Sequence, residues 1–288
     1  MLANESVLEL IQARLGECTP AERRVARAVM ASYPAAGLET VAKLSQRAGT
    51  SAPSVLRFAT RLGFGSFPEF QQALRDELEA RDASPLAALG QAGDARAAGA
   101  SVAQPESRSS SFLAGIQRTF ERLPDEELTT AISLLSDTQR RLTVAGGRFS
   151  RLLAEYLAQH LMQLRPGVRM LPDSAVTRAD MVLGVDKRDV LILFDYRRYE
   201  PPTLDVARQA QEQGAKIILL TDRWLSPVAS MATVVLPSYV DSPSAYDSYV
   251  PSLAVLEVLV AGVLQALGEN AASRMHQFEA LSQKLSLV

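Results

Sequence analysis

Cysteine and histidine are scarce in this chain. Its 288 residues include one cysteine, Cys18, and two histidines, His160 and His276. A single thiol cannot form an internal disulfide or a cysteine-based zinc site, and two histidines are too few for a histidine-rich metal centre. We therefore expect a protein of a reducing compartment, the cytoplasm, that holds no metal and uses no other cofactor.

Targeting signals and long apolar runs are also lacking. The first residues carry neither the basic stretch nor the apolar core of a secretory signal peptide. No apolar run reaches the ~20 residues that span a bilayer. The longest, 253–267, is interrupted by Glu257 and is interpreted as a buried helix. We therefore expect no membrane partner.

Charge is nearly balanced over the whole chain but not along it. Thirty basic residues against 32 acidic ones leave a net charge of −2, which argues against a disordered chain or one that coats nucleic acid along its length. Residues 19–65, in contrast, carry a net charge of +5. A basic patch confined to one segment indicates contact with phosphates. Its basic residues are Arg23, Arg24, Arg27, Lys43, Arg47, Arg57 and Arg61.

The basic segment contains the pattern of a helix-turn-helix. A short predicted helix, 39–47, ends at Gly49, and a second one follows with Ser51 as its cap and Pro53 in its first turn. The residues expected on its buried side are Val55, Leu56, Ala59 and Leu62. The residues expected to contact DNA are Lys43, Arg47, Thr50, Ser51, Ser54, Arg57 and Arg61. The alternative is an ordinary helix pair with a solvated arginine face.

Composition divides the chain into three segments. Residues 1–80 read as helical throughout, and residues 81–110 are rich in Ala, Gly, Ser and Pro, as in a linker. From 111 to 288, apolar runs of strand length alternate with helical segments, and strands without in–out alternation are buried on both faces of a sheet. We therefore predict an all-α domain followed by a three-layer α/β domain with a parallel sheet. Its expected strands are 142–145, 168–171, 190–194, 217–220 and 234–236.

Two loops at strand ends are candidate ligand sites, because open parallel sheets bind ligands at the carboxyl ends of their strands. One loop, 146–150, is a glycine-containing turn that leads into a helix, and the other, 195–200, carries paired arginines suited to a planar anion. The residues expected to bind a ligand are Gly146, Gly147, Arg148, Ser150, Asp195, Arg197 and Arg198. The alternative is a scaffold in which Arg197 or Arg198 pairs with Asp195, Glu200 or a partner subunit.

Both halves of the chain resemble a known family. The first half resembles the helix-turn-helix domain of the RpiR family of bacterial transcription regulators, on the motifs Pro20-Ala-Glu-Arg-Arg-Val-Ala26, Leu44-Ser45, Ser51-x-x-Ser54-Val-x-Arg57-Phe58, Leu62-Gly-Phe64 and Phe67-Pro-Glu-Phe70. The second half resembles the sugar-isomerase (SIS) domain of these regulators, on the 146–150 turn, Asp189-Val190, Ala210-x-x-x-Gly214-Ala-Lys216, Thr221-Asp222 and Ser226-Pro227. The resemblance implies DNA binding by the first domain and phosphosugar sensing by the second.

One loop departs from the family pattern. Where such SIS domains carry Ser-x-Ser-Gly-x-Thr to cradle a sugar phosphate, this chain has the loop Asp195-Tyr-Arg-Arg-Tyr-Glu200, without the hydroxyl pair or the glycine. Arg148 and Phe149 also alter the first turn, and Asp195 would repel a phosphate. The resemblance therefore carries the fold but not the phosphosugar, and we expect a carboxylate-bearing sugar derivative or another small acid as the ligand.

The resulting hypothesis is a DNA-binding regulator of a bacterial catabolic or transport operon, without enzymatic activity. Its SIS-like domain would bind a small anionic, sugar-derived effector and form a homodimer or tetramer. In one alternative this domain only dimerises, with Arg148 and Arg197 paired to acids and no open pocket. In another the chain is a sugar-phosphate isomerase, for which Glu257 and His160 are the acid/base candidates.

Overall fold

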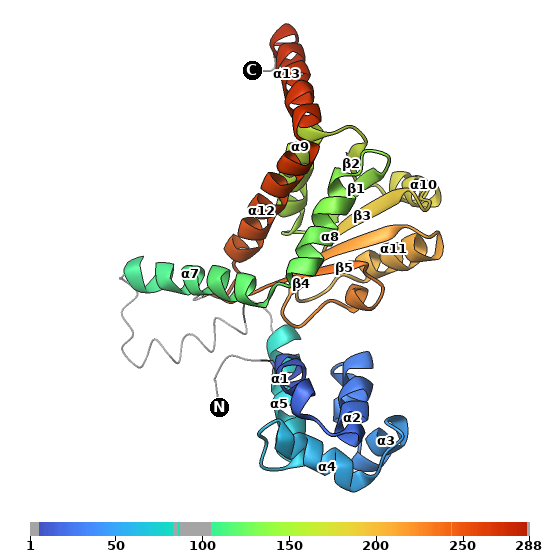
Figure 1. The fold of residues 1–288 in the computed structure, drawn as a ribbon, viewed down its shortest axis with the longest axis vertical. Coiled ribbons are helices and arrows are strands. Elements are labelled where there is room, and N and C mark those ends of the chain that lie inside the picture. The colour runs from blue at the N-terminus through green and yellow to red at the C-terminus, as the bar shows by residue number, and fades with distance from the viewer. Residues whose placement is uncertain (1–5, 83–85, 87–104, 243, 287–288) are drawn as a thin grey trace. The chain divides into compact units, whose positions relative to one another are not determined.

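The computed structural model describes residues 6–82, 86, 105–242 and 244–286 (Figure 1). The chain divides into two compact units, Met1–Ser84 and Pro85–Val288, and each has its own hydrophobic core. Most of the predicted linker, 81–110, lies outside the described residues. Its end does not: the helix α7 (Pro105–Arg122) begins inside the segment assigned to the linker.

The N-terminal unit is helical, as the sequence predicts. Capping boxes begin two of its helices, where the side chains of Ser6 and Thr19 accept hydrogen bonds from backbone N–H groups and a glutamate three residues later reaches back. The helices are α1 (Val7–Arg14), α2 (Pro20–Ala31), α3 (Val41–Arg47), α4 (Ala52–Arg61) and α5 (Phe67–Asp82), with 3-10 turns at Leu15–Glu17 and Ala35–Leu38.

An aromatic cluster holds α4 and α5 together. Phe70 of α5 is fully buried, and its ring lies 6.1 Å from that of Phe58, 5.5 Å from that of Phe64 and 5.6 Å from that of Phe67, measured between centroids. Edge-on and tilted ring pairs of this kind add to the stabilisation from burial. The orientation of α4 therefore depends on its packing against α5 as well as on the turn before it.

The second unit is the predicted three-layer α/β domain. Its five strands are parallel in the order β2-β1-β3-β4-β5, so β1 and β3 are neighbours. The strands are β1 (Arg141–Gly146), β2 (Val168–Met170), β3 (Asp189–Phe194), β4 (Lys216–Asp222) and β5 (Val234–Ser238). The further helices are α8 (Asp125–Ser136), α9 (Arg151–Leu164), α10 (Ala175–Leu183), α11 (Pro201–Glu212), α12 (Val250–Leu267) and α13 (Glu269–Lys284), with a 3-10 turn at Pro227–Ser230.

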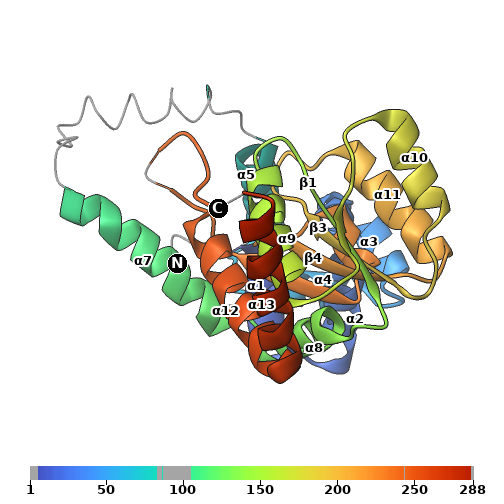
Figure 2. The same cartoon turned by 90° about the horizontal axis from the view of Figure 1, so that it is seen from above.

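Helices cover both faces of the sheet (Figure 2). On β3, Val190, Ile192 and Phe194 face a core shared with α8, α9 and α12, whereas Leu191 and Leu193 face α10 and α11. This double burial explains why the strands read as continuous apolar runs. The sequence analysis does not predict the helix α10, 175–183, of whose residues only Val182 is buried.

Among the described residues, α12 is long and apolar enough to cross a membrane, judged by length and composition alone. In this unit it is a core helix, since Val255, Leu256, Leu259 and Val263 are fully buried against the neighbouring helices and the sheet. The opposite side of α12 exposes Val258 and other apolar side chains.

A buried arginine joins the end of α8 to the start of β1. Arg165 is 1% exposed, and its guanidinium donates at 2.8 Å to the carbonyl oxygens of Leu135 and Asp137 and also to that of Arg140. Its Nε donates to the carbonyl of Pro166 at 3.0 Å. Burial lowers the pKa of this guanidinium. The side chain thus satisfies carbonyl groups that the end of a helix leaves without partners.

Replacing Arg165 by Met should lower the free energy of unfolding of the C-terminal unit by about 2–4 kcal/mol, because backbone carbonyls between α8 and β1, among them the buried one of Leu135, lose a charged donor. The chain has one tryptophan, Trp224, which is buried in this unit, so urea unfolding followed by its fluorescence reports this unit alone. The exposed Arg188→Met is the control and should leave the free energy of unfolding close to that of the wild type. Equal effects of the two substitutions would contradict the role given to Arg165.

Candidate functional site

The helix-turn-helix lies in the N-terminal unit, where α3 and α4 are joined by the turn 48–51. Gly49 has φ +57°, a left-handed conformation that favours glycine. Ser51 stands at the N-cap position of α4, but its hydroxyl lies 3.1 Å from that of Ser54 and caps no backbone N–H. The two serines therefore form a hydroxyl pair at the start of α4.

The exposed face of α4 differs from the expected one at two positions. Ser54 is 3% exposed, although it was expected to face outward, and Leu56 is 47% exposed, although it was expected to be buried. The cause is Phe58, which is fully buried and, with Val55 and Leu62, sets the core-facing side of the helix. The outward face is formed by Ala52, Pro53, Leu56, Arg57, Thr60 and Arg61.

The predicted cationic contacts fall into two groups. Arg47 forms an ion pair with Glu39 at 2.5 Å, and Arg61 lies 3.7 Å from the carboxylate of Glu22. Arg57 donates to the Ser54 hydroxyl at 3.1 Å, and in the described part of the chain neither Arg57 nor Lys43 has a recorded ion pair. Lys43 is exposed and Thr50 half-buried beside this face. Arg57 is therefore the arginine of α4 best placed to reach a ligand outside the unit.

In the C-terminal unit, the turn after β1 is locked to the end of β3. The Ser150 hydroxyl accepts from the Gly147 N–H at 2.9 Å and donates to the carbonyl of Phe194 at 3.0 Å. A Cβ at Gly146 would lie 2.7 Å from the backbone nitrogen of Arg151, so the turn requires glycine. Ser150 is 5% exposed. Its hydroxyl, which the sequence analysis predicts to bind a ligand, holds the shape of the turn in this structure.

The loop after β3 is held by buried carboxylates. Asp195, 4% exposed, accepts from the Ser226 hydroxyl and from the Glu200 N–H. Arg197 pairs with Asp247, its Nε 2.7 Å from a carboxylate oxygen, and its guanidinium lies 5.5 Å from the ring centroid of Trp224. Arg198 is exposed and has φ +66°. Asp195 and Arg197 thus both have structural roles here, but Arg197 pairs with Asp247 and not with Asp195 or Glu200, the partners that the scaffold alternative named within this chain.

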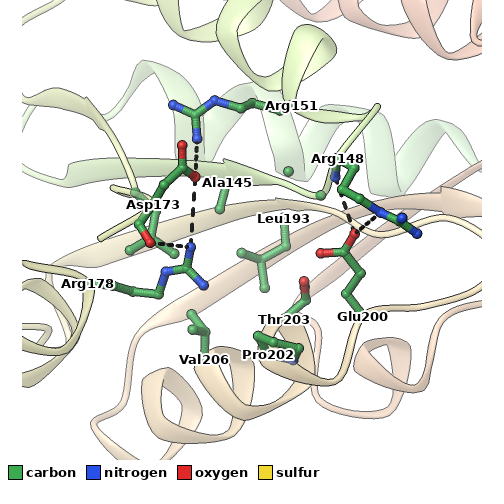
Figure 3. Close-up of a pocket in the computed structure, with 13 residues that line it drawn as sticks. Ala145, Arg148, Arg151, Asp173, Arg178, Leu193, Glu200, Pro202, Thr203 and Val206 are labelled. Atoms are coloured by element: carbon green, nitrogen blue, oxygen red, sulfur yellow. Dashed lines mark hydrogen bonds and ion pairs between the residues drawn. The ribbon is translucent and has the colours of Figure 1, made fainter. Parts of the chain in front are cut away.

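A larger hollow lies beside the turn, over the ends of β1, β2 and β3 (Figure 3). Its volume is about 320 Å³, against about 40 Å³ for the hollow between the two predicted loops. We call the larger one the edge pocket. Its lining residues are Ala145, Gly146, Gly147, Arg148, Arg151, Leu171, Asp173, Arg178, Leu193, Glu200, Pro202, Thr203 and Val206.

Charged groups stand at two ends of the edge pocket, with an apolar floor between them (Figure 3). At one end Asp173 lies 2.6 Å from a nitrogen of Arg151 and 3.9 Å from one of Arg178. At the other end Arg148 lies 3.7 Å from Glu200. The pocket can therefore offer both cations and carboxylates to a polar ligand.

Of the predicted ligand residues, the edge pocket includes Gly146, Gly147 and Arg148, whereas Ser150, Asp195, Arg197 and Arg198 line the smaller hollow. Sequence reasoning missed Arg151, Asp173 and Arg178 and treated Glu200 only as a partner for an arginine. Asp173 could have been found, because it follows a predicted strand. Arg178 could not, because it lies on the unexpected helix α10.

The two acid/base candidates of the isomerase alternative lie outside both hollows. The Nδ1 atom of His160 is 2.9 Å from the carbonyl oxygen of Tyr156, on α9. Glu257, on α12, accepts from the Tyr156 hydroxyl. Neither residue lines either of the two hollows, so neither is placed to move a proton on a ligand bound there.

Burial raises the pKa of two aspartates at this edge. Asp222 is fully buried at the end of β4, where desolvation raises its pKa to about 6 although Tyr199 and two backbone N–H groups donate to it. Desolvation likewise raises the pKa of Asp195 to about 6. A carboxyl with a raised folded pKa binds more protons folded than unfolded, so stability falls as the pH rises from about 4 to about 6.

Asp222→Asn should remove this pH dependence at one site. When the pH is lowered from 7 to 5, the wild type should gain about 1 kcal/mol of unfolding free energy relative to the variant, because it protonates a buried carboxylate. Urea unfolding followed by Trp224 fluorescence at both pH values measures the difference. A constant difference between wild type and variant would mean that Asp222 keeps an ordinary pKa.

Comparison with known families gives one match in each unit. The description "Helix-turn-helix domain, rpiR family" matches residues 5–81, and "SIS domain" matches residues 134–262. Both lie where the sequence motifs predicted them.

Two relatives that match this chain over most of their own length carry regulator names. HTH-type transcriptional regulator HexR of Pseudomonas aeruginosa is 26% identical over 266 residues, covering 90% of this chain and 89% of that protein. HexR of Escherichia coli is 24% identical over 270 residues, covering 89% and 87%. The Bifunctional protein glk of Burkholderia mallei is 26% identical over 268 residues, 91% of this chain but only 40% of that protein.

Solved structures share the fold. The sugar isomerase domain of an RpiR transcription factor from Sphaerobacter thermophilus covers 61% of this chain and 98% of its own, with 23% identity and a TM-score of 0.56. The Vibrio vulnificus NanR protein, complexed with ManNAc-6P, covers 96% and 98%, with 17% identity and a TM-score of 0.55. Since family matches and near-full-length relatives agree in both units, the chain belongs to the RpiR family of transcriptional regulators, with a helix-turn-helix domain ahead of a SIS domain.

Proposed function

We propose that this regulator controls a bacterial catabolic or transport operon in response to a small anionic, sugar-derived effector bound in the edge pocket. The observation that carries the proposal is the pocket itself, an open volume of about 320 Å³ at the carboxyl edge of the sheet with three arginines in its lining. Ligands of open parallel sheets bind at this edge. NanR, whose structure contains ManNAc-6P, supports a sugar derivative as the ligand class.

The edge pocket favours this function over a SIS domain that only dimerises. Arg148 and Arg197 are paired with Glu200 and Asp247, as that alternative required. The same alternative also required that no pocket stay open, and the edge pocket is open. The relatives named as regulators and the positions of His160 and Glu257 likewise argue against an isomerase.

We further propose that the protein acts in the cytoplasm as a homodimer on double-stranded DNA. Helix-turn-helix proteins read paired half-sites as dimers, since one module offers little contact area. The outer side of α12 and the adjoining α13 expose apolar side chains, among them Val258, Leu264, Phe278 and Leu281. An apolar surface of this kind suits contact with a second copy of the chain.

The DNA-binding face is tested at Arg57. Arg57→Ala should weaken binding to a duplex selected by the wild-type protein from random DNA by roughly 5- to 150-fold, the equivalent of ~1–3 kcal/mol for one base contact. Binding to random duplex should change less, so the ratio of the two affinities should fall. Fluorescence anisotropy with both duplexes at one salt concentration measures the ratio.

Arg75→Ala is the matched control, because Arg75 is an exposed arginine of α5 whose guanidinium donates to the Gln72 side chain. It should change neither affinity by more than about twofold. An unchanged ratio with both affinities reduced would mean that Arg57 contacts only the DNA backbone. No change in either affinity would remove α4 from the recognition role.

The effector site is tested with a thermal-shift screen over sugar phosphates, sugar acids and amino-sugar derivatives. For the compound that stabilises the wild type, Arg178→Gln should weaken binding by roughly ten- to a hundredfold, because one charge-assisted hydrogen bond to an anion is lost. Arg208→Gln, an exposed arginine of α11 paired with Asp205, should bind normally. Calorimetry measures both, and equal affinities in the three proteins would place the ligand outside the edge pocket.

A further inference from the structure

The carboxylate of Glu200 lies in the glycine turn after β1. The Arg148 N–H donates to its Oε1 at 3.2 Å, and the Arg148 guanidinium lies 3.7 Å from the same oxygen (Figure 3). A Cβ added at Gly147 would lie 2.7 Å from this oxygen, so the carboxylate rests against the bare glycine backbone. Glu200 comes directly before α11, and its own N–H donates to the buried Asp195. The residue is thus held at both its backbone and its side chain.

This arrangement has a chemical consequence for the ligand. Glycine turns before helices bind anions, because the backbone can approach closely and N–H groups point outward. In this chain an internal anion already takes that position. A phosphate or carboxylate entering the turn would meet Glu200 at short range and with like charge. A hydroxyl or amine, in contrast, could donate a hydrogen bond to the Glu200 carboxylate.

The opposite end of the edge pocket has the reverse character. Asp173 there is 75% exposed, and it lies between Arg151 and Arg178. An exposed carboxylate gains little from its ion pairs, so a ligand anion can replace it beside the two arginines at small cost. Between the ends, Leu171, Leu193 and Val206 form an apolar floor without competing charges.

We propose that Glu200 determines the ligand class of the edge pocket by occupying the anion position of the glycine turn. The pocket then takes a polyhydroxylated carboxylic acid, with hydroxyls at Glu200 and the carboxylate at Arg151 and Arg178. This inference rests on the proposed function for the existence of an effector. The exclusion of an anion from the turn is a property of the folded C-terminal unit and can be measured without DNA or the effector.

The test uses inorganic phosphate as the probe and Glu200→Gln as the variant. Melting of the full chain is followed by Trp224 fluorescence in rising phosphate, with sodium chloride at equal ionic strength as the reference, because a ligand of the folded state raises the midpoint. Glu200→Gln should bind phosphate at least tenfold more tightly than the wild type. The gain should persist when Arg178 is also replaced by Gln, which separates the turn from the other end of the pocket.

Asp205→Asn is the matched control, because it removes one exposed carboxylate of α11 that pairs outward with Arg208. It should bind phosphate like the wild type. Equal gains in phosphate affinity in Asp205→Asn and Glu200→Gln would mean that net charge alone causes the effect, and would overturn the proposal. No gain in phosphate affinity in Glu200→Gln would also overturn it. If Glu200→Gln loses its cooperative melting, Glu200→Ala is measured in its place with the same two outcomes. If the protein does not bind DNA, the proposed function is wrong, but the difference in phosphate affinity between Glu200→Gln and the wild type is unaffected.

Discussion

The pairing of β1 with β3 is the constraint on which the candidate ligand site depends. Parallel register places Gly146 beside Phe194, so the turn after β1 and the loop after β3 leave the sheet at the same edge. The Ser150 hydroxyl joins the two by bonding the Gly147 N–H and the Phe194 carbonyl. Because that hydroxyl is used internally, the anion-binding groups left in the turn are backbone N–H groups and the Arg148 guanidinium, and Glu200 lies beside both kinds.

The fold was largely predictable, and the reason is physical. Strands buried on both faces are apolar over most of their length, so β3 and β4 stand out in the sequence. The exceptions follow the same logic. α10 lies at the edge of its layer and buries little, and Leu56 is an apolar residue on an outward face, where hydrophobicity alone gives the wrong side.

The candidate site was predictable only in part, because ion pairing depends on contacts between distant segments. Arg148 and Arg197 look alike in the sequence as cations at strand ends. In the structure Arg148 is largely exposed beside the edge pocket, whereas Arg197 is held by Asp247, fifty residues away. The departure of residues 195–200 from the family loop did indicate altered ligand chemistry. What it could not show was that Glu200 reaches back to the turn after β1.

We propose that one unit reads DNA and the other senses a ligand, with a coupling free energy between the two sites. Such coupling is reciprocal, so the ligand must change operator affinity by the same factor by which the operator changes ligand affinity. The most direct measurement is the affinity of the screened effector for the free protein and for the protein bound to its selected duplex. We expect different affinities, in a ratio equal to the effector's effect on DNA binding. Identical ligand affinities with and without DNA would contradict it.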